Sequence, residues 1–283
     1  MRFPLAFKHC RFRAVELNCA LPRVASKPMP LASLSVVDSE VAIPELATIP
    51  PDPTARTIGG LVAELIPPGS ALELGVGRAL SGVAGAISAR GTEISIHSGL
   101  ISDWAQELVE NGNAVRPMAC GEGASVVAAV AMGSADFYRW LDGTPSVRLV
   151  DSFHAHDPAH LPAINGFVAV NAASEVDCFG QVGAPERAAP TRVVGGLLDF
   201  AIAGAYGGGK SIIVLESIDR AGRSRITVNA TNVQLQAQLV TYVVTEHGIA
   251  RMAGRTWRER TREMVAIAHP DHRDELRKTL DRQ

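Results

Sequence analysis

Short apolar runs separated by segments of helical spacing constrain the fold of this chain more than any other feature. Three of these runs are residues 167–171 (FVAVN), 211–215 (SIIVL) and 242–245 (YVVT). They lack the alternation of apolar and polar residues that is typical of a strand with one face in water, so we expect strands that are buried on both faces. The sequence therefore predicts an α/β fold, an open and mainly parallel sheet with helices on both faces.

The segments between these runs show apolar residues at helical spacing. The predicted helices cover residues 56–66, 80–89, 103–111, 197–205, 257–267 and 271–280, and two further strands are predicted at residues 71–74 and 93–97. Residues 44–53 (PELATIPPDP) have the composition of a linker, because proline removes a backbone donor and biases its neighbour to extended backbone. We expect the compact part of the domain to begin just after them.

The first 35 residues differ from the rest in charge, with six basic residues and one acidic residue. Lys8, His9, Arg11 and Arg13 interrupt every apolar run that a signal peptide would need. We predict residues 1–35 to be a basic, unstructured extension and residues 36–283 to form the domain. A transit peptide, or a start codon placed too far upstream, are the alternatives for the extension.

Composition excludes several classes of function. The 283 residues hold 27 Lys and Arg against 29 Asp and Glu, a net charge of −2, so we expect no nucleic acid or anionic membrane as a partner. No apolar run reaches the length of a membrane-spanning helix. The four cysteines form no C-x-x-C pair, which indicates a reducing, cytoplasmic location. The expected partner is a small molecule or another protein.

Three local motifs point to cofactors or metals, and each is outweighed by its context. Residues 204–211 (GAYGGGKS) have P-loop spacing, but a predicted helix precedes them and a strand follows, the reverse of a P-loop. Residues 75–77 (GVG) open like a dinucleotide fingerprint, yet Leu80 replaces the third glycine. The polar residues 151–160 include His154, His156 and His160 and match no strong zinc spacing, so we favour a solvated loop. We expect neither cofactor nor metal.

A glycine pair, Gly195 and Gly196, precedes the predicted helix at residues 197–205. Glycines at the start of a helix can present backbone N–H groups to an oxyanion or a phosphate. A turn that needs positive φ explains the pair equally well, and the residues alone leave both interpretations open.

Several segments, taken in order, resemble the acetyl-CoA hydrolase/transferase family, specifically its C-terminal half, as in 4-hydroxybutyrate or acetate CoA-transferases. They are residues 175–177 (EVD), 180–182 (GQV), 195–200 (GGLLDF), 208–213 (GGKSII), 242–250 (YVVTEHGIA) and 267–270 (IAHP). The resemblance covers roughly residues 36–283. It implies a CoA-transferase-like fold of the NagB/RpiA type, with an acyl-CoA and a small carboxylic acid or water as substrates, and CoA as substrate rather than cofactor.

The resemblance also implies site residues. Gly195 and Gly196 match the family's glycine-rich CoA-site loop, and we extend the CoA-binding prediction to Gly208, Gly209 and Lys210. In such enzymes a glutamate carboxylate attacks the thioester and becomes a glutamyl-CoA thioester, which is covalent catalysis aided by backbone donors. A homo-oligomer is implied as well.

The chain departs from the family at the nucleophile. The family's glutamate follows a His-Ser or His-Thr pair, and Gly99 stands at that place, after His97 and Ser98. Glu122, between two glycines, is a weak candidate for a replacement carboxylate, and His97 is a weak candidate for a base that activates water.

Two functions from different classes follow. The first is an acyl-CoA:carboxylate CoA-transferase or acetyl-CoA hydrolase domain that binds CoA thioesters without the usual nucleophile. The alternative is a non-catalytic CoA-binding or regulatory subunit, or a truncated remnant, that needs a separate N-terminal half. A nicotinamide enzyme is a third hypothesis. NADH binding would support it, and we expect this chain not to bind NADH.

Overall fold

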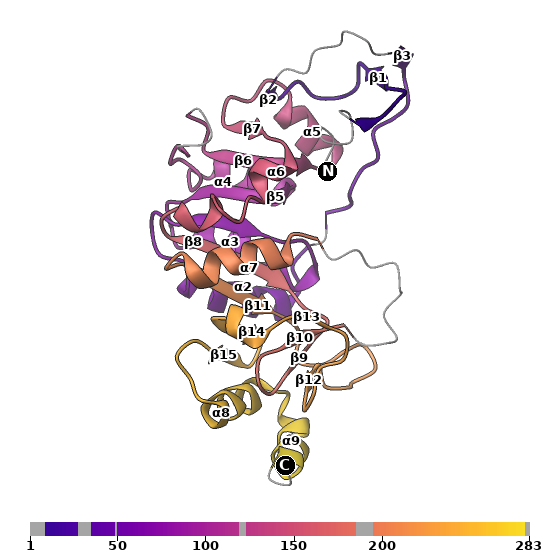
Figure 1. The fold of residues 1–283 in the computed structure, drawn as a ribbon. Helices are drawn as coiled ribbons and strands as arrows, with labels where there is room; N and C mark the ends of the chain where they lie inside the picture. The colour runs from indigo at the N-terminus through magenta and orange to yellow at the C-terminus, as the bar shows by residue number, and fades with distance from the viewer. Residues whose placement is uncertain (1–8, 28–34, 49, 119–122, 185–194, 281–283) are drawn as a thin grey trace.

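The computed structural model describes residues 9–27, 35–48, 50–118, 123–184 and 195–280, and a nine-stranded sheet forms its centre (Figure 1). The strand order is β15-β14-β11-β8-β4-β5-β6-β7-β2. All neighbouring pairs are parallel except β14 and β15, which are antiparallel. In chain order the strands are β2 (Ala25–Ser26), β4 (Ala71–Leu74), β5 (Ser95–Ile101), β6 (Val126–Ala131), β7 (Val147–Leu149), β8 (Phe167–Ala172), β11 (Lys210–Val214), β14 (Tyr242–Thr245) and β15 (Gly248–Arg251).

Helices cover both faces of this sheet, as predicted. They are α2 (Pro53–Glu64), α3 (Val83–Ala89), α4 (Asp103–Glu110), α5 (Ala135–Leu141), α6 (Ser152–Ala155), α7 (Leu197–Tyr206), α8 (Trp257–Ile267) and α9 (Pro270–Leu280), with short 3-10 turns η1 (Arg78–Leu80), η3 (Leu161–Ala163) and η4 (Ala237–Leu239). Four of them, α2, α5, α6 and α8, begin at side-chain caps. For example, the Asp52 carboxylate accepts from the Ala55 amide, and Thr256 and Glu259 form a capping box.

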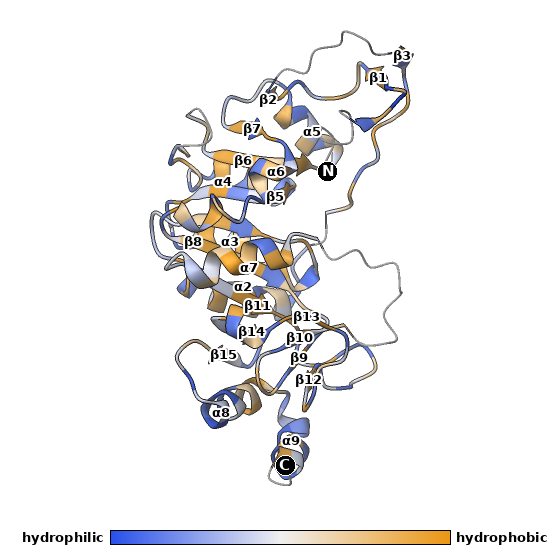
Figure 2. Cartoon of the chain, viewed as in Figure 1, coloured by the Kyte–Doolittle hydropathy of each residue, from blue (hydrophilic) through white to orange (hydrophobic). Residues whose placement is uncertain are grey.

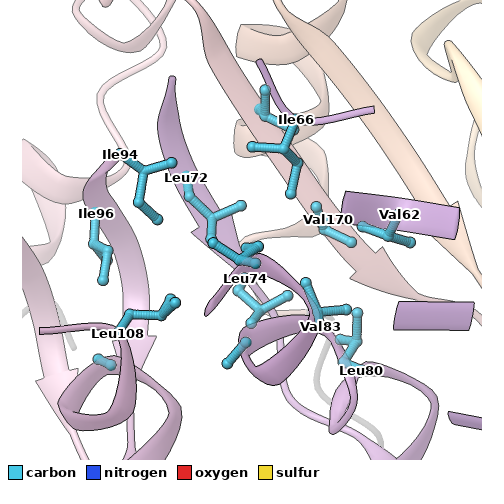
Figure 3. Packing of buried hydrophobic residues seen from close by; sticks show 14 of the residues in the cluster. Val62, Ile66, Leu72, Leu74, Leu80, Val83, Ile94, Ile96, Leu108 and Val170 are labelled. Atoms are coloured by element: carbon cyan, nitrogen blue, oxygen red, sulfur yellow. The ribbon is translucent and has the colours of Figure 1, made fainter. Parts of the chain in front are cut away.

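Alternation along the strands sorts side chains onto the two faces, because successive residues of a strand point to opposite sides. Leu72 and Leu74 belong to the largest core, which α2, α3 and α4 cover. Figure 3 shows these two side chains between Ile94 and Ile96 on one side and Val170 on the other. Ala71 points the opposite way, into a smaller core under α7. Glu73 therefore shares the α7 face of the sheet.

A second, four-stranded sheet lies toward the carboxyl-terminal end of the molecule (Figure 1). Its order is β12-β9-β10-β13, formed by β9 (Glu175–Asp177), β10 (Val182–Gly183), β12 (Ile226–Thr227) and β13 (Val233–Leu235). Its apolar residues share one core with α8, α9 and the α7 face of β11 and β14. In Figure 2 the ribbons of α8 and α9 are mainly hydrophilic with some apolar positions, in agreement with helices that bury one side only.

The acidic residues of the EVD segment hold this small sheet together. The Asp177 carboxylate is fully buried and accepts hydrogen bonds from the amides of Phe179 and Gln181 and from the Gln181 side chain. Glu175 accepts from the backbone amide and the hydroxyl of Thr231. The EVD segment, which is part of the family resemblance, thus stabilises the small sheet.

The amino-terminal stretch differs from our expectation of an unstructured extension where the structure describes it. β1 (Ala14–Asn18) pairs in parallel with β3 (Ser35–Ser39), and β2 extends the large sheet beside β7. Edge pairing supplies backbone partners that composition does not reveal. The boundary between an extension and a domain at residue 36 stays a prediction. Within the described ranges no helix is long and apolar enough to cross a membrane.

Candidate functional site

A cavity of about 1060 Å³ opens at the carboxyl ends of three central strands of the large sheet. Leu74 ends β4 and Gly75 follows it, Gly99 and Leu100 lie near the end of β5, and Asn171 lies near the end of β8. The other walls come from the segment after α6, from the start of α7 and from the small sheet. Ligands of open α/β proteins bind at this edge, because the loops after parallel strands converge there.

Gly99 lines the cavity and has no room for a side chain. A Cβ placed on it would lie 2.9 Å from Nε2 of His156 and 3.1 Å from a ring carbon of Phe200. Both distances are shorter than ordinary carbon contacts, so any side chain at this position would displace the imidazole, the phenyl ring or both. The position that the family resemblance assigns to the nucleophile is therefore occupied in space by His156.

The His156 imidazole is enclosed on several sides. Gly196 lies on another side of the ring, since a Cβ on it would meet His156 Cε1 at 2.5 Å. The ring packs on Phe200, with 4.7 Å between ring centres. Its Nδ1 lies 3.2 Å from Oδ2 of Asp199, in the first turn of α7. Two glycines, one aromatic ring and one carboxylate thus fix the orientation of this histidine.

His97 contacts the backbone of the segment that carries His156. It is fully buried on β5, and its Nε2 lies 3.0 Å from the carbonyl oxygen of Ala155, the residue before His156. Burial lowers the pKa of His97 to about 4, so the ring is neutral, and a carbonyl can only accept, so Nε2 carries the proton. His97 does not line the cavity. Its geometry fits a positioning role, not the water-activating role for which it was a candidate.

Glu73 is a carboxyl group on the cavity wall that pattern reasoning missed. Only 3% of the residue is exposed, and Nδ2 of Asn171 donates to its Oε2 at 2.7 Å. Burial raises the pKa of Glu73 to about 8, because little water remains to stabilise the charge. At neutral pH this side chain is mainly a neutral acid, which makes it a poor nucleophile.

The structure separates the five predicted CoA-binding residues into two groups. Gly195 and Gly196 line the cavity. Gly208, Gly209 and Lys210 do not; they lie at the amino end of β11, whereas the cavity lies at the carboxyl ends of the strands. The Lys210 ammonium donates to the carbonyl of Leu65, and a Cβ on Gly209 would overlap the carbonyl oxygen of Phe167. Close packing accounts for these residues in the fold, and their part in CoA binding stays a prediction.

The remaining predictions concern Glu122 and the histidines of residues 151–160. Glu122 lies outside the described residues. His154 stacks on His160, with 5.3 Å between ring centres. In the part of the chain that the structure describes, no group of three His, Cys, Asp or Glu side chains could hold a metal ion.

Sequence reasoning missed the pairing of His156 with Asp199. Asp199 belongs to a segment that carried the resemblance, but His156 was interpreted as part of a solvated loop. A signal was present for Glu73, a carboxyl group inside the strand predicted at residues 71–74. No comparable signal predicts that residues 99 and 156 meet, because 57 positions separate them in the chain.

The fold and the cavity define a class: an α/β protein with a small-molecule site at the carboxyl edge of a parallel sheet. The family model described as "Acetyl-CoA hydrolase/transferase C-terminal domain" matches residues 133–280, about half of the chain. The chain belongs to this family.

Curated relatives agree with that assignment. A 4-hydroxybutyrate coenzyme A transferase from Clostridium kluyveri is 31% identical over 271 residues, which are 92% of this chain and 62% of the relative. A succinyl-CoA:cyclohexane-1-carboxylate CoA transferase from Geobacter metallireducens is 31% identical, over 96% of this chain and 64% of the relative. The chain thus spans less than two thirds of the length of these relatives.

Solved structures share the fold. RipA from Yersinia pestis superposes with a TM-score of 0.88 and 27% identity, over 98% of this chain and 64% of RipA. A 4-hydroxybutyrate CoA-transferase from Porphyromonas gingivalis gives a TM-score of 0.81 and 26% identity, over 96% of this chain and 66% of that protein.

Proposed function

We propose that the cavity binds the thioester end of an acyl-CoA and that this chain does not form a glutamyl-CoA intermediate at position 99. One observation carries the proposal: Gly99, at the nucleophile position implied by the resemblance, lines the same cavity as Gly195 and Gly196 of the CoA-site loop. Relatives named as CoA transferases support an acyl-CoA and a small carboxylic acid as substrates, and the family name supports water as another acceptor. The acyl specificity stays open.

The charges on the cavity wall favour one part of the CoA molecule. Among the described lining residues, Glu73, His156, Asp157 and Asp199 are titratable, and neither lysine nor arginine is present. Phosphates are bound by basic side chains and helix ends. The cavity therefore suits the uncharged pantetheine arm and its thioester, and we expect the phosphates to lie outside it.

The second function is the alternative from the sequence, a non-catalytic subunit that works with a separate polypeptide. The chain then acts as a CoA-binding subunit, with turnover only in the presence of that partner. A cytoplasmic location and a homo-oligomeric state remain predictions from the sequence.

Calorimetric titration of the full chain with CoA and acetyl-CoA tests the proposed site. Val76 lines the cavity and is 54% exposed, so Val76→Trp narrows the cavity without changing the core. Val115 is 49% exposed and does not line it, so Val115→Trp is the matched control. We expect micromolar binding by the wild type, about −8 kcal/mol. We also expect a loss of tenfold or more in Val76→Trp, and unchanged binding in Val115→Trp.

Two results contradict this proposal. One is absence of binding by a folded wild-type chain. The other is equal affinity of the two tryptophan variants, which would place the ligand elsewhere.

A further inference from the structure

We propose that Glu73, held by Asn171, binds the carboxylate of the small acid substrate in this cavity by sharing one proton with it. The proposal rests on the proposed function and deepens it, because it names the residue that recognises the acceptor acid. A neutral glutamic acid donates the hydrogen bond and the substrate anion accepts it, so the contact needs no basic residue.

The position of Glu73 is the first argument. On β4 and β8, Leu74 pairs with Val170. Asn171 is therefore opposite Gly75, two residues nearer to the cavity edge of the sheet than Glu73. Because Oε2 of Glu73 accepts from Nδ2 of Asn171 at 2.7 Å, the Glu73 side chain leans along the strand toward that edge.

Gly75 leaves room for the pair that Glu73 and Asn171 form. A Cβ on Gly75 would lie 3.1 Å from Oδ1 of Asn171, which is tighter than an ordinary contact. Glu73, Gly75 and Asn171 all line the cavity. A buried carboxyl group, fixed by an amide and with no side chain at the next position of its own face, is thus part of the ligand wall.

Hydrogen bonding is the second argument. The described partners of the Glu73 carboxyl group are the side-chain amide of Asn171 and the backbone amide of Val170, and both are donors. Neither can accept the O–H of a neutral carboxyl group. Burial favours that neutral form, because it raises the pKa of Glu73 to about 8. A ligand in the cavity that accepts this proton completes the set of hydrogen bonds.

Charge is the third argument. Around the cavity the titratable side chains include His97 on β5, His156 and Asp157 after α6, Asp199 on α7, and Arg78, which is paired with Glu216 at 2.7 Å. None of these side chains contributes to the raised pKa of Glu73, which follows from burial. Neither lysine nor arginine is among the described residues that line the cavity.

A substrate carboxylate at this wall therefore needs a neutral donor. Two carboxyl groups at hydrogen-bond distance bind stably only when they share a proton, since two negative charges there repel each other. Glu73 supplies that proton. Asn171 is accordingly a positioning residue, and Glu73 is the residue that contacts the acid.

The test titrates the full chain with butyrate by calorimetry at pH 7 and pH 9, with butyramide as the uncharged control ligand. Butyrate is an anion at both pH values, whereas Glu73 loses its proton as pH rises through about 8. We expect the wild type to bind butyrate about tenfold more weakly at pH 9 than at pH 7. Butyramide can accept from the neutral acid and donate to the carboxylate, so its affinity should change less than threefold.

Glu73→Gln replaces the acid by a donor that stays neutral, and it keeps an acceptor for Asn171. We expect this variant to bind butyrate within threefold of the wild type at pH 7 and to keep that affinity at pH 9, where it then binds more tightly than the wild type. Glu73→Ala removes the donor and should lose tenfold or more at pH 7.

Glu107 provides the matched control. It lies on α4, burial raises its pKa as well, and it does not line the cavity. Glu107→Gln should therefore follow the wild type at both pH values. Circular dichroism at pH 7 and pH 9 checks that each variant is folded.

The outcomes are distinct from those of the proposed function, which CoA binding decides. If the chain binds CoA but no butyrate, or binds butyrate equally at pH 7 and pH 9, this inference is overturned and the CoA site stands. An equal loss of affinity at pH 9 in Glu73→Gln and in the wild type would also overturn it, because another group would then carry the pH dependence. Unchanged butyrate binding by Glu73→Ala would do the same.

Discussion

Nε2 of His156 lies 2.9 Å from where a side chain at position 99 would start, so the two residues compete for one space. Glycine at 99 and histidine at 156 are therefore structurally coupled. The glycine at position 99 and the imidazole of His156 are two aspects of one arrangement.

This coupling predicts non-additive stability. Gly99→Ala alone should lower the free energy of unfolding by about 1–3 kcal/mol, because the new methyl group overlaps His156 and Phe200. In a His156→Ala background the same change should be milder, with a coupling energy of about 0.5–2 kcal/mol. Urea denaturation of the four proteins measures it. Additive effects would show that the two positions do not share space.

The raised pKa of Glu73 predicts a decrease of stability toward alkaline pH. Its folded pKa, about 8, exceeds the ordinary value of 4.5, so the folded chain binds the extra proton between these values. The contribution of Glu73 is fully present below about pH 4.5 and is lost as pH rises through 8, on the order of 1–4 kcal/mol. Glu73→Gln keeps an acceptor for Asn171 and should gain stability relative to wild type between pH 5.5 and 8.5, measured by denaturant titration. A constant difference across this range would contradict the assignment.

The lowered pKa of His97 predicts a decrease of stability toward acidic pH. Burial lowers its pKa from 6.5 to about 4, so the unfolded chain binds the extra proton between these values. Stability from the neutral ring is complete above pH 6.5 and is lost as pH falls toward 4. His97→Gln, which retains a donor for the Ala155 carbonyl, should flatten that part of the pH–stability curve. His154→Gln serves as the control that keeps it; identical curves for all three proteins would refute the prediction.

Asp177 predicts the largest loss of stability from a single carboxylate. Its removal leaves the part-buried amides of Phe179 and Gln181 without an acceptor and empties a fully buried position, so Asp177→Ala should cost about 3 kcal/mol. Asp52→Ala removes one helix cap and should cost about 1 kcal/mol. Thermal unfolding compares the two variants. A smaller effect at Asp177 than at Asp52 would show that water replaces the lost partner.

Much of the fold could be predicted because local pattern and tertiary burial agree. The runs at residues 167–171, 211–215 and 242–245 form β8, β11 and β14, and all six predicted helices are present within a few residues. β6 was not predicted, because its run VVAAVA is rich in alanine and carries no strand periodicity. The strands of the small sheet contain two or three residues each, too few for any periodicity to show.

The site was less predictable because it depends on contacts between distant segments. Gly195 and Gly196 were found through a motif, and they do line the cavity. The GGK segment lies at the amino end of β11, and a glycine pattern alone does not reveal at which end of a parallel strand it falls. The pairing of His156 with Asp199 joins a polar loop to a helix start, 43 residues apart, which only the folded chain brings together.

Hydrogen–deuterium exchange of the full chain with and without CoA shows directly whether the cavity is the CoA site. We predict that CoA slows exchange in the cavity-lining segments, residues 152–158 and 195–200, and leaves residues 207–211 unchanged. Slower exchange at 207–211 without any change at 152–158 and 195–200 would contradict it and place the CoA site at the opposite edge of the sheet.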